Sequence, residues 1–170
     1  EYALRAMRLI APNLRTVYRE PSNAIARAAM MKGATLAGIA FSNSSVALVH
    51  GMSRPIGAHF HVPHGLSNAM LLPAVTEYSL NAALPRYAEA ARAMGVASAA
   101  EGDQSAAAAL LQELRDLNRD LAVPSPAAFG IDPANWDALL PTMAAQALAS
   151  GSPANNPAVP TAGEIVSLYH

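Results

Sequence analysis

Four of the five histidines lie in a segment of sixteen residues, HGMSRPIGAHFHVPHG, that runs from His50 to Gly65. Neutral imidazole is the commonest protein ligand for divalent metals. His50 follows an apolar run and precedes a glycine, whereas His64 stands between a proline and a glycine, before a second apolar run. Each is therefore expected at the end or the beginning of a helix, with a glycine-bearing connection between them. We interpret His50 and His64 as candidate metal ligands.

The other two histidines of the segment are weaker candidates. His59 and His61 flank Phe60, and in an extended segment they would point to opposite sides. We expect at most one of them to join His50 and His64, and the other to lie in solvent or at the rim of a pocket. For each histidine an alternative stays open, because histidines beside glycine or proline often cap helices or form hydrogen bonds in loops.

Two imidazoles do not complete a catalytic metal site. Such a site usually takes three protein ligands and keeps one position open, as in zinc enzymes. The nearest acidic residues, Glu77 and Glu89, are expected on solvated faces of helices. A metal centre here would need further ligands from elsewhere.

Composition indicates one helical domain. Of 170 residues 52% are hydrophobic but only 5% aromatic, and alanine is abundant, which favours closely packed helices over a β-sandwich. The formal net charge of −1 gives no electrostatic reason to expect nucleic acid or an anionic membrane as a partner. No apolar run is seen to approach the roughly 20 residues that span a bilayer. Without cysteine there is no disulfide, and without a visible secretory signal a cytoplasmic setting is expected.

Apolar residues recur at helical spacing along most of the chain, which predicts an all-α bundle of about six to nine helices. The first predicted helix, Tyr2–Tyr18, contains Pro12, which is expected to kink or break it. The second, Ala24–Phe41, is rich in small residues that permit close approach of helices, so we expect it to be among the most buried. Later helices are expected over Gly65–Leu80, Pro85–Met94 and Ser105–Leu121, from Asp132 onward, and after a capping box formed by Thr161 and Glu164.

A longer pattern surrounds the histidines and continues to the end of the chain. It consists of AGIAFSN at 37–43, HGM at 50–52, PIGA at 55–58, PHG at 63–65, NA at 68–69, LP at 72–73, RYA at 86–88 and NP at 156–157. This pattern resembles the C-terminal domain of the iron-containing (group III) alcohol dehydrogenases. The chain opens at Glu1 with helical periodicity already running and without an initiator methionine, so we interpret it as part of a longer protein.

The resemblance implies a fold and a set of ligands. Residues 1–170 would form one all-helical metal-binding domain, similar to the α domain of dehydroquinate synthase, while the N-terminal dinucleotide-binding domain is absent from this chain. His50 and His64 would be the family's two C-terminal ligands for Fe²⁺, or Zn²⁺ in some members. The family's other two ligands, an aspartate and a histidine four residues apart, come from a helix upstream of this sequence, and NAD(P) is bound mainly by the missing domain.

One position departs from the family pattern. Many members carry a second histidine four residues after the first, near the substrate and the nicotinamide, and this chain has Arg54 there. The departure puts a histidine proton relay in doubt and indicates a cation that faces substrate, cofactor or a carboxylate. The alternative is that Arg54 caps helix carbonyls before Pro55.

Further pocket candidates are Phe41 and Phe60 as apolar wall residues, although core packing is the commoner fate of phenylalanine. His59 and His61 are candidates for the rim of the same pocket.

The implied activity is that of a metal-dependent NAD(P) alcohol dehydrogenase that acts on a small alcohol or aldehyde, and a homodimer is an assembly that the resemblance allows. In this family the divalent metal acts as a Lewis acid on the substrate, and hydride passes to the nicotinamide. This chain would supply two ligands and part of the cleft, and alone it is expected to be inactive. The alternative is a non-catalytic helical module that uses the histidine-rich segment for structure or partner contact.

Overall fold

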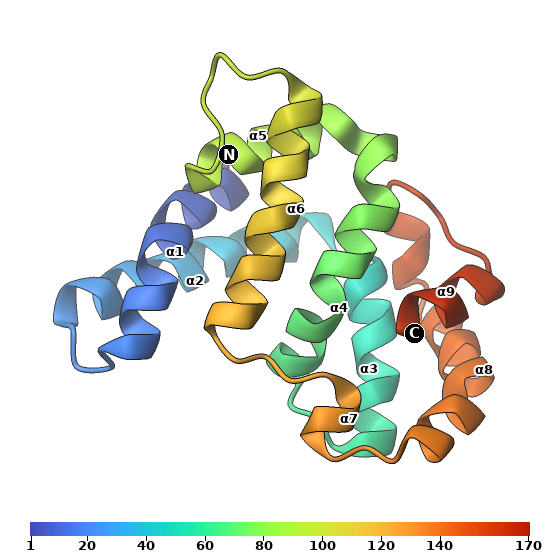
Figure 1. Ribbon diagram of the computed structural model, residues 1–170. Coiled ribbons are helices and arrows are strands. Elements are labelled where there is room, and N and C mark those ends of the chain that lie inside the picture. Colours follow the sequence, from blue (N-terminus) through green and yellow to red (C-terminus); the bar gives the residue numbers. More distant parts are fainter. The chain divides into compact units, whose positions relative to one another are not determined.

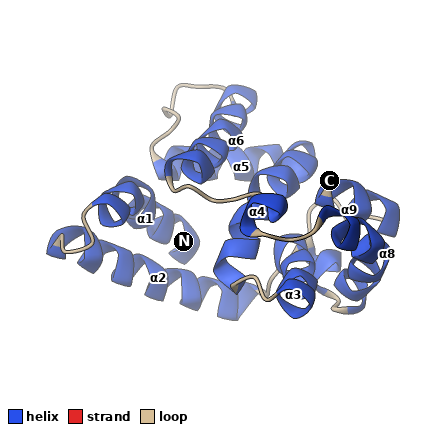
Figure 2. Cartoon of the chain, turned by 60° about the horizontal axis from the view of Figure 1, so that its bottom comes forward, coloured by secondary structure: helices blue, strands red, loops and turns tan.

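The computed structural model describes all 170 residues, and it contains only helices and loops (Figures 1 and 2). This confirms the all-α fold class, and the nine α-helices agree with the expected number. The α-helices are α1 Tyr2–Arg19, α2 Ala24–Ser44, α3 Leu48–Phe60, α4 His64–Ser79, α5 Leu84–Met94, α6 Asp103–Asp120, α7 Pro126–Phe129, α8 Pro133–Ala149 and α9 Ala162–Tyr169; the 3₁₀ helices are η1 Leu80–Ala83 and η2 Ser152–Asn155.

The chain divides into two compact units, each built from two separate stretches. Unit 1 comprises Glu1–Ser44 and Ala83–Leu121, and unit 2 comprises Ser45–Ala82 and Ala122–His170. All four histidines of the clustered segment belong to unit 2. The assignment of residues 1–170 to a single domain stays a prediction.

In unit 1, α1 packs against α2 and α5, and α5 packs against α6. Small residues set the close approach of α1 and α2: a Cβ added at Gly33 of α2 would lie 2.6 Å from Cγ1 of Ile10. Helix α1 continues through Pro12, so the predicted break at that residue is wrong. A small core of Ala88, Ala91, Ala106 and Leu110 joins α5 to α6.

Helix α2 corrects two expectations. Only Ala26 and Gly33 of its residues are buried, so the prediction that Ala24–Phe41 is among the most buried segments is wrong. Its small residues let α1 approach along one face, while Ile25 and Met31 are 83% and 70% exposed on the rest of the helix. By length and composition alone α2 is also apolar enough to cross a membrane. Arg27 and Lys32 are the only two charged residues of this helix.

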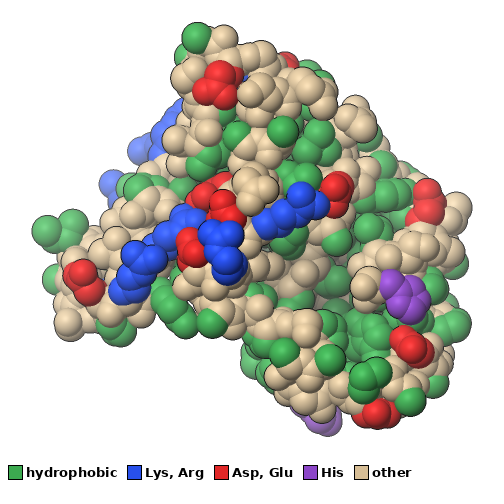
Figure 3. Space-filling view, viewed as in Figure 1, with side chains coloured by type: hydrophobic (Ala, Val, Ile, Leu, Met, Phe, Trp, Pro, Cys, Tyr) green, Lys and Arg blue, Asp and Glu red, His purple; other side chains and the backbone are tan.

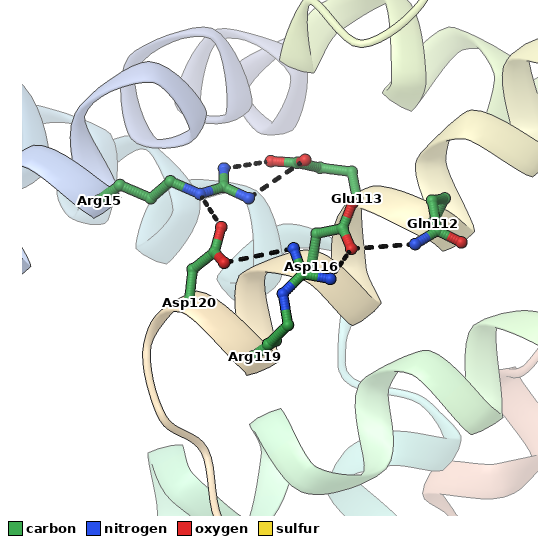
Figure 4. Close-up of polar contacts among 6 residues, drawn as sticks. All are labelled: Arg15, Gln112, Glu113, Asp116, Arg119 and Asp120. Carbon is green, nitrogen blue, oxygen red and sulfur yellow. Dashed lines mark hydrogen bonds and ion pairs between the residues drawn. The ribbon is translucent and has the colours of Figure 1, made fainter.

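An ionic cluster links α1 to α6 within unit 1 (Figure 4). The Arg15 guanidinium donates from Nη1 to Glu113 Oε1 at 2.6 Å and from Nε to Asp120 Oδ2 at 2.7 Å. Arg119 also pairs with Asp120, at 3.3 Å. Basic and acidic side chains accordingly lie side by side on the surface drawn in Figure 3. The hydrogen bond from Arg15, followed by the charge of Arg119, holds the pKa of Asp120 below its ordinary value.

This cluster predicts how stability depends on pH. Because the pKa of Asp120 is lower in the folded state, the unfolded state takes up the proton first, so the stabilisation is complete above the ordinary aspartate pKa of about 3.9 and is lost as pH falls below it. We expect Arg15→Gln to lower the melting temperature above this pH and to lose less on acidification than the wild type. Thermal melts followed by circular dichroism at a series of pH values test this, with exposed Arg5→Gln as the control. Parallel acid curves for wild type and Arg15→Gln would contradict it.

Unit 2 is built around α3. Leu48, Met52 and Ile56 recur every fourth residue along this helix and are almost completely buried. They pack in one core with residues of α4, α8 and α9, including Trp136 and Ile165. A hydrogen bond also joins α9 to α3: the buried Tyr169 hydroxyl donates to the Met52 carbonyl at 2.7 Å. Helix α3 is thus fixed both by apolar packing and by a hydrogen bond from the last helix.

A close contact at Gly51 holds α3 against η2. A Cβ added at Gly51 would lie 3.0 Å from both Cγ and Cδ of Pro153. We expect Gly51→Ala to lower the free energy of unfolding by about 1–3 kcal/mol, because the proline ring must give way in a packed interior. Gly65→Ala is the matched control, since nothing lies within 4 Å of its added Cβ. Urea denaturation of the two variants tests this. Equal denaturation midpoints for Gly51→Ala and Gly65→Ala would contradict a close contact between Gly51 and Pro153.

A three-residue turn joins α3 to α4. Helix α3 ends at Phe60, and His61 follows with φ of 55°, donating its backbone N–H to the Gly57 carbonyl at 3.0 Å. Val62 is buried, and Pro63 precedes the first residue of α4, His64. The segment around His59 and His61 is therefore not extended, because helix α3 continues through Phe60.

Candidate metal centre

The structure brings the rings of His50 and His64 together. His50 lies in the first turn of α3, His64 opens α4, and their ring centroids are 5.2 Å apart with the ring planes inclined by 59°. Two imidazoles that bind one tetrahedral zinc at about 2.1 Å have ring centroids roughly 5 Å apart. The spacing of the pair therefore fits a shared divalent ion.

Hydrogen bonds define the state of the His64 ring. The Asn68 amide nitrogen donates to the His64 carbonyl at 2.8 Å and also lies 3.1 Å from Nε2 of the same residue. Since an amide nitrogen only donates, Nε2 must accept, and the neutral ring carries its proton on Nδ1. Ser53 Oγ lies 3.5 Å from that Nδ1. Nε2 of His64 is thus unprotonated, and its lone pair, which a metal would need, accepts the Asn68 hydrogen bond in this structure.

His50 is also held in the form that binds metals. Burial, the nearby His64 and then the charge of Arg54 lower the pKa of His50 from its ordinary value. A lower pKa leaves the ring neutral at physiological pH, and only the neutral ring has a free lone pair.

One buried atom at this place has no partner. Asn68 Oδ1 is the buried side-chain polar atom that makes no hydrogen bond, although its amide nitrogen is fully engaged with His64. Buried polar atoms are satisfied in most proteins, so an orphan beside the histidine pair fits a position that another group completes. The chain itself does not supply a third ligand, because no group of three or more His, Cys, Asp or Glu side chains could hold a metal. The donor set fits two positions of a metal centre.

Comparison with known proteins places the chain in a family. All 170 residues match the Fe-containing alcohol dehydrogenase family, C-terminal. The chain belongs to this family.

Relatives and solved structures agree with this membership. The chain is 34% identical to the 1,3-propanediol dehydrogenase of Citrobacter freundii over 168 residues, which is 98% of this chain and 42% of that protein. It is 37% identical to the lactaldehyde reductase of Escherichia coli K12 over 141 residues, 83% of this chain and 36% of that enzyme. A crystal structure of a 1,3-propanediol oxidoreductase superposes with a TM-score of 0.91 at 33% identity, covering 99% of this chain and 43% of the other. The chain thus spans less than half the length of the relatives that it matches.

The remaining histidines of the family segment do not join the pair. His59 Nε2 lies 2.9 Å from Gln146 Oε1, so this ring links α3 to α8. His61 is exposed and ends α3 in the left-handed conformation. That His59 or His61 lies at the rim of a substrate pocket stays a prediction. That Phe41 and Phe60 form an apolar wall of this pocket also stays a prediction. Phe60 packs against the core, and its ring lies 5.4 Å from that of Trp136 between centroids, with the planes inclined by 34°. Phe41 belongs to unit 1 and is 56% exposed.

Arg54, the departure from the family pattern, lies on α3 one turn after His50. Its side chain is exposed, and Nη1 donates to Ser152 Oγ at 3.3 Å. No carboxylate pairs with it. Glu77 and Glu89, which were expected on solvated faces, are both exposed.

Sequence reasoning overlooked the side chains that surround the pair. Ser53 follows His50 by three residues and Asn68 follows His64 by four, so both lie on the same helix faces as the histidines. That spacing was a usable signal once the two helices were predicted. Gln146 could not be found in this way, because its contact with His59 joins residues 87 apart in the chain.

The hydrogen bonds predict which nitrogen of His64 carries the proton. At about pH 8, where an ordinary imidazole is neutral, we expect Nδ1 protonated and Nε2 bare, because Asn68 donates to Nε2. Two-bond ¹⁵N–¹H correlation spectra of the metal-free chain distinguish the two tautomers, and Asn68→Ala should weaken the preference. A proton found on Nε2 of His64 would contradict the arrangement.

Proposed function

We propose that the complete protein is a metal- and NAD(P)-dependent alcohol dehydrogenase that acts on small alcohols or aldehydes, and that this chain supplies His50 and His64 as two of its metal ligands. The observation that carries the proposal is the convergence of these two rings, 5.2 Å apart, in a chain that matches the family over its whole length. The two relatives are named for 1,3-propanediol and lactaldehyde, which supports a small alcohol or aldehyde as substrate.

Fe²⁺, or Zn²⁺, would supply Lewis-acid chemistry at the substrate oxygen when bound beside the two rings. His50 contributes a lone pair because burial keeps it neutral. His64 would offer Nε2, the nitrogen that the Asn68 amide contacts at 3.1 Å in this structure. Ser53, fixed by the packing of α3, lies at the other ring nitrogen and orients the ring. The remaining ligands, and the site that binds NAD(P), belong to the part of the protein outside this chain.

The proposal predicts the effect of removing either ligand in the complete protein. His50→Ala and His64→Ala should each lower kcat/KM for a small alcohol by at least about 100-fold, since even losing an outer partner of a metal ligand costs 10–100-fold. Metal content, measured by plasma mass spectrometry, should fall together with activity. His170→Ala is the matched control, because this exposed histidine lies outside the pair.

Two outcomes would contradict this. Full activity and metal content in both variants would favour the non-catalytic helical module. Turnover by the purified 170-residue chain would show that half of the ligands and the missing cofactor domain are dispensable. A cytoplasmic setting and a homodimer stay predictions, and sedimentation of the complete protein tests the second.

A further inference from the structure

The side chain of Asn68 lies one turn after His64 on helix α4. Its amide nitrogen donates to the His64 carbonyl at 2.8 Å and lies 3.1 Å from Nε2 of the His64 ring. A carbonyl oxygen only accepts hydrogen bonds, so the carbonyl fixes which end of the amide faces the histidine. The second N–H of the same amide is then available to the ring, where Nε2 accepts it. Both contacts lie within one turn of a single helix, so the local sequence is sufficient to form them.

The contact with the ring distinguishes Asn68 from other helical asparagines of this protein. Asn13 donates to the Leu9 carbonyl at 2.8 Å, and Asn43 donates to the Ile39 carbonyl at 2.7 Å, in each case four residues earlier. A bond of this kind to the asparagine's own helix implies no function by itself. At Asn68 the residue four positions earlier is a candidate metal ligand, so the same bond brings the amide to a ring nitrogen.

The other nitrogen of the His64 ring faces helix α3. Nδ1 lies 3.5 Å from the hydroxyl of Ser53, a residue that is completely buried. Because Nε2 accepts the hydrogen bond from Asn68, the proton of the neutral ring is on Nδ1. Nε2 is therefore the nitrogen of His64 that has a lone pair to offer.

A ring nitrogen has one lone pair, which accepts one hydrogen bond or binds one metal ion. The contact with Asn68 and a metal bound at Nε2 are therefore mutually exclusive. An interaction that exists in only one of two states shifts the equilibrium toward that state. We propose that Asn68 competes with the metal for Nε2 of His64 and thereby lowers the affinity of the centre for its ion.

The inference rests on the proposed function and adds the residue that keeps the ion exchangeable. Asn68 is a positioning residue in this account, because the amide holds the ring in the tautomer that binds metals. Its bond to the His64 carbonyl does not involve the ring, so the ion displaces only the contact with Nε2.

Metal affinity in variants of the complete protein tests the inference. The protein is stripped of metal with a chelator, and Zn²⁺ binding is then measured by competition with a fluorescent zinc indicator. Asn68→Ala should bind Zn²⁺ about 2- to 10-fold more tightly than the wild type, which is the range expected from one neutral hydrogen bond. Alanine is the strongest helix former, so the substitution is compatible with α4.

Asn13→Ala is the matched control. It removes an amide–carbonyl bond of the same length, 2.8 Å, from a helix position that has no histidine four residues earlier. Its affinity for Zn²⁺ should equal that of the wild type. A double variant then shows whether the effect passes through the ring: His64→Ala should lower the affinity, and adding Asn68→Ala should change it no further.

Three results would overturn the inference. An unchanged affinity in Asn68→Ala would show that the amide does not compete with the ion. A weaker affinity would show that the amide supports the bound ion, as outer partners of metal ligands do. A gain in affinity that persists in the His64→Ala background would show that Asn68 does not act through the ring.

The same measurements separate this inference from the proposed function. If His64→Ala binds Zn²⁺ as tightly as the wild type, His64 is not a ligand, and the proposed ligand pair fails together with the inference. If His64→Ala loses the ion while Asn68→Ala has the affinity of the wild type, the ligand pair stands and only the inference fails.

Discussion

The packing of helix α3 is the constraint on which the candidate site depends. Leu48, Met52 and Ile56 bury one face of this helix, and Gly51 brings its backbone against Pro153. Because a helix is rigid, burying that face fixes where the other side chains of the first two turns point. His50 and Arg54 are placed by this packing, and the short turn through His61 and Val62 then brings α4 back with His64 as its first residue.

Electrostatics explain why this place differs from an ordinary helix pair. The two imidazole rings lie close together. Burial lowers the pKa of His50, because the charged form of a histidine is less stable away from water. An asparagine oxygen is buried there without a partner. The only arginine of the unit stands one turn away with no carboxylate beside it. The ring pair and the unpartnered oxygen together fit a position that a metal completes.

Helical periodicity was sufficient to predict the fold class and most helices, because apolar spacing and caps are local properties. The capping box of Thr161 and Glu164 is present, and α5 ends at Met94 as predicted. The burial of α2 was predicted wrongly. Small residues indicate that another helix can pack closely on one face of α2, but they do not indicate that its remaining faces are covered. The convergence of His50 and His64 was accessible from sequence because two adjacent helices carry them. Ser152, which anchors Arg54, was not accessible, because that contact spans 98 residues.

The central claim is that His50 and His64 bind one metal ion. Anomalous diffraction from crystals of the complete protein, loaded with Fe²⁺ or Zn²⁺ and measured at the absorption edge of the metal, tests this most directly. The account predicts one strong peak within about 2.1 Å of a nitrogen of each ring. A fully occupied metal bound elsewhere, with neither His50 nor His64 among its ligands, would contradict it.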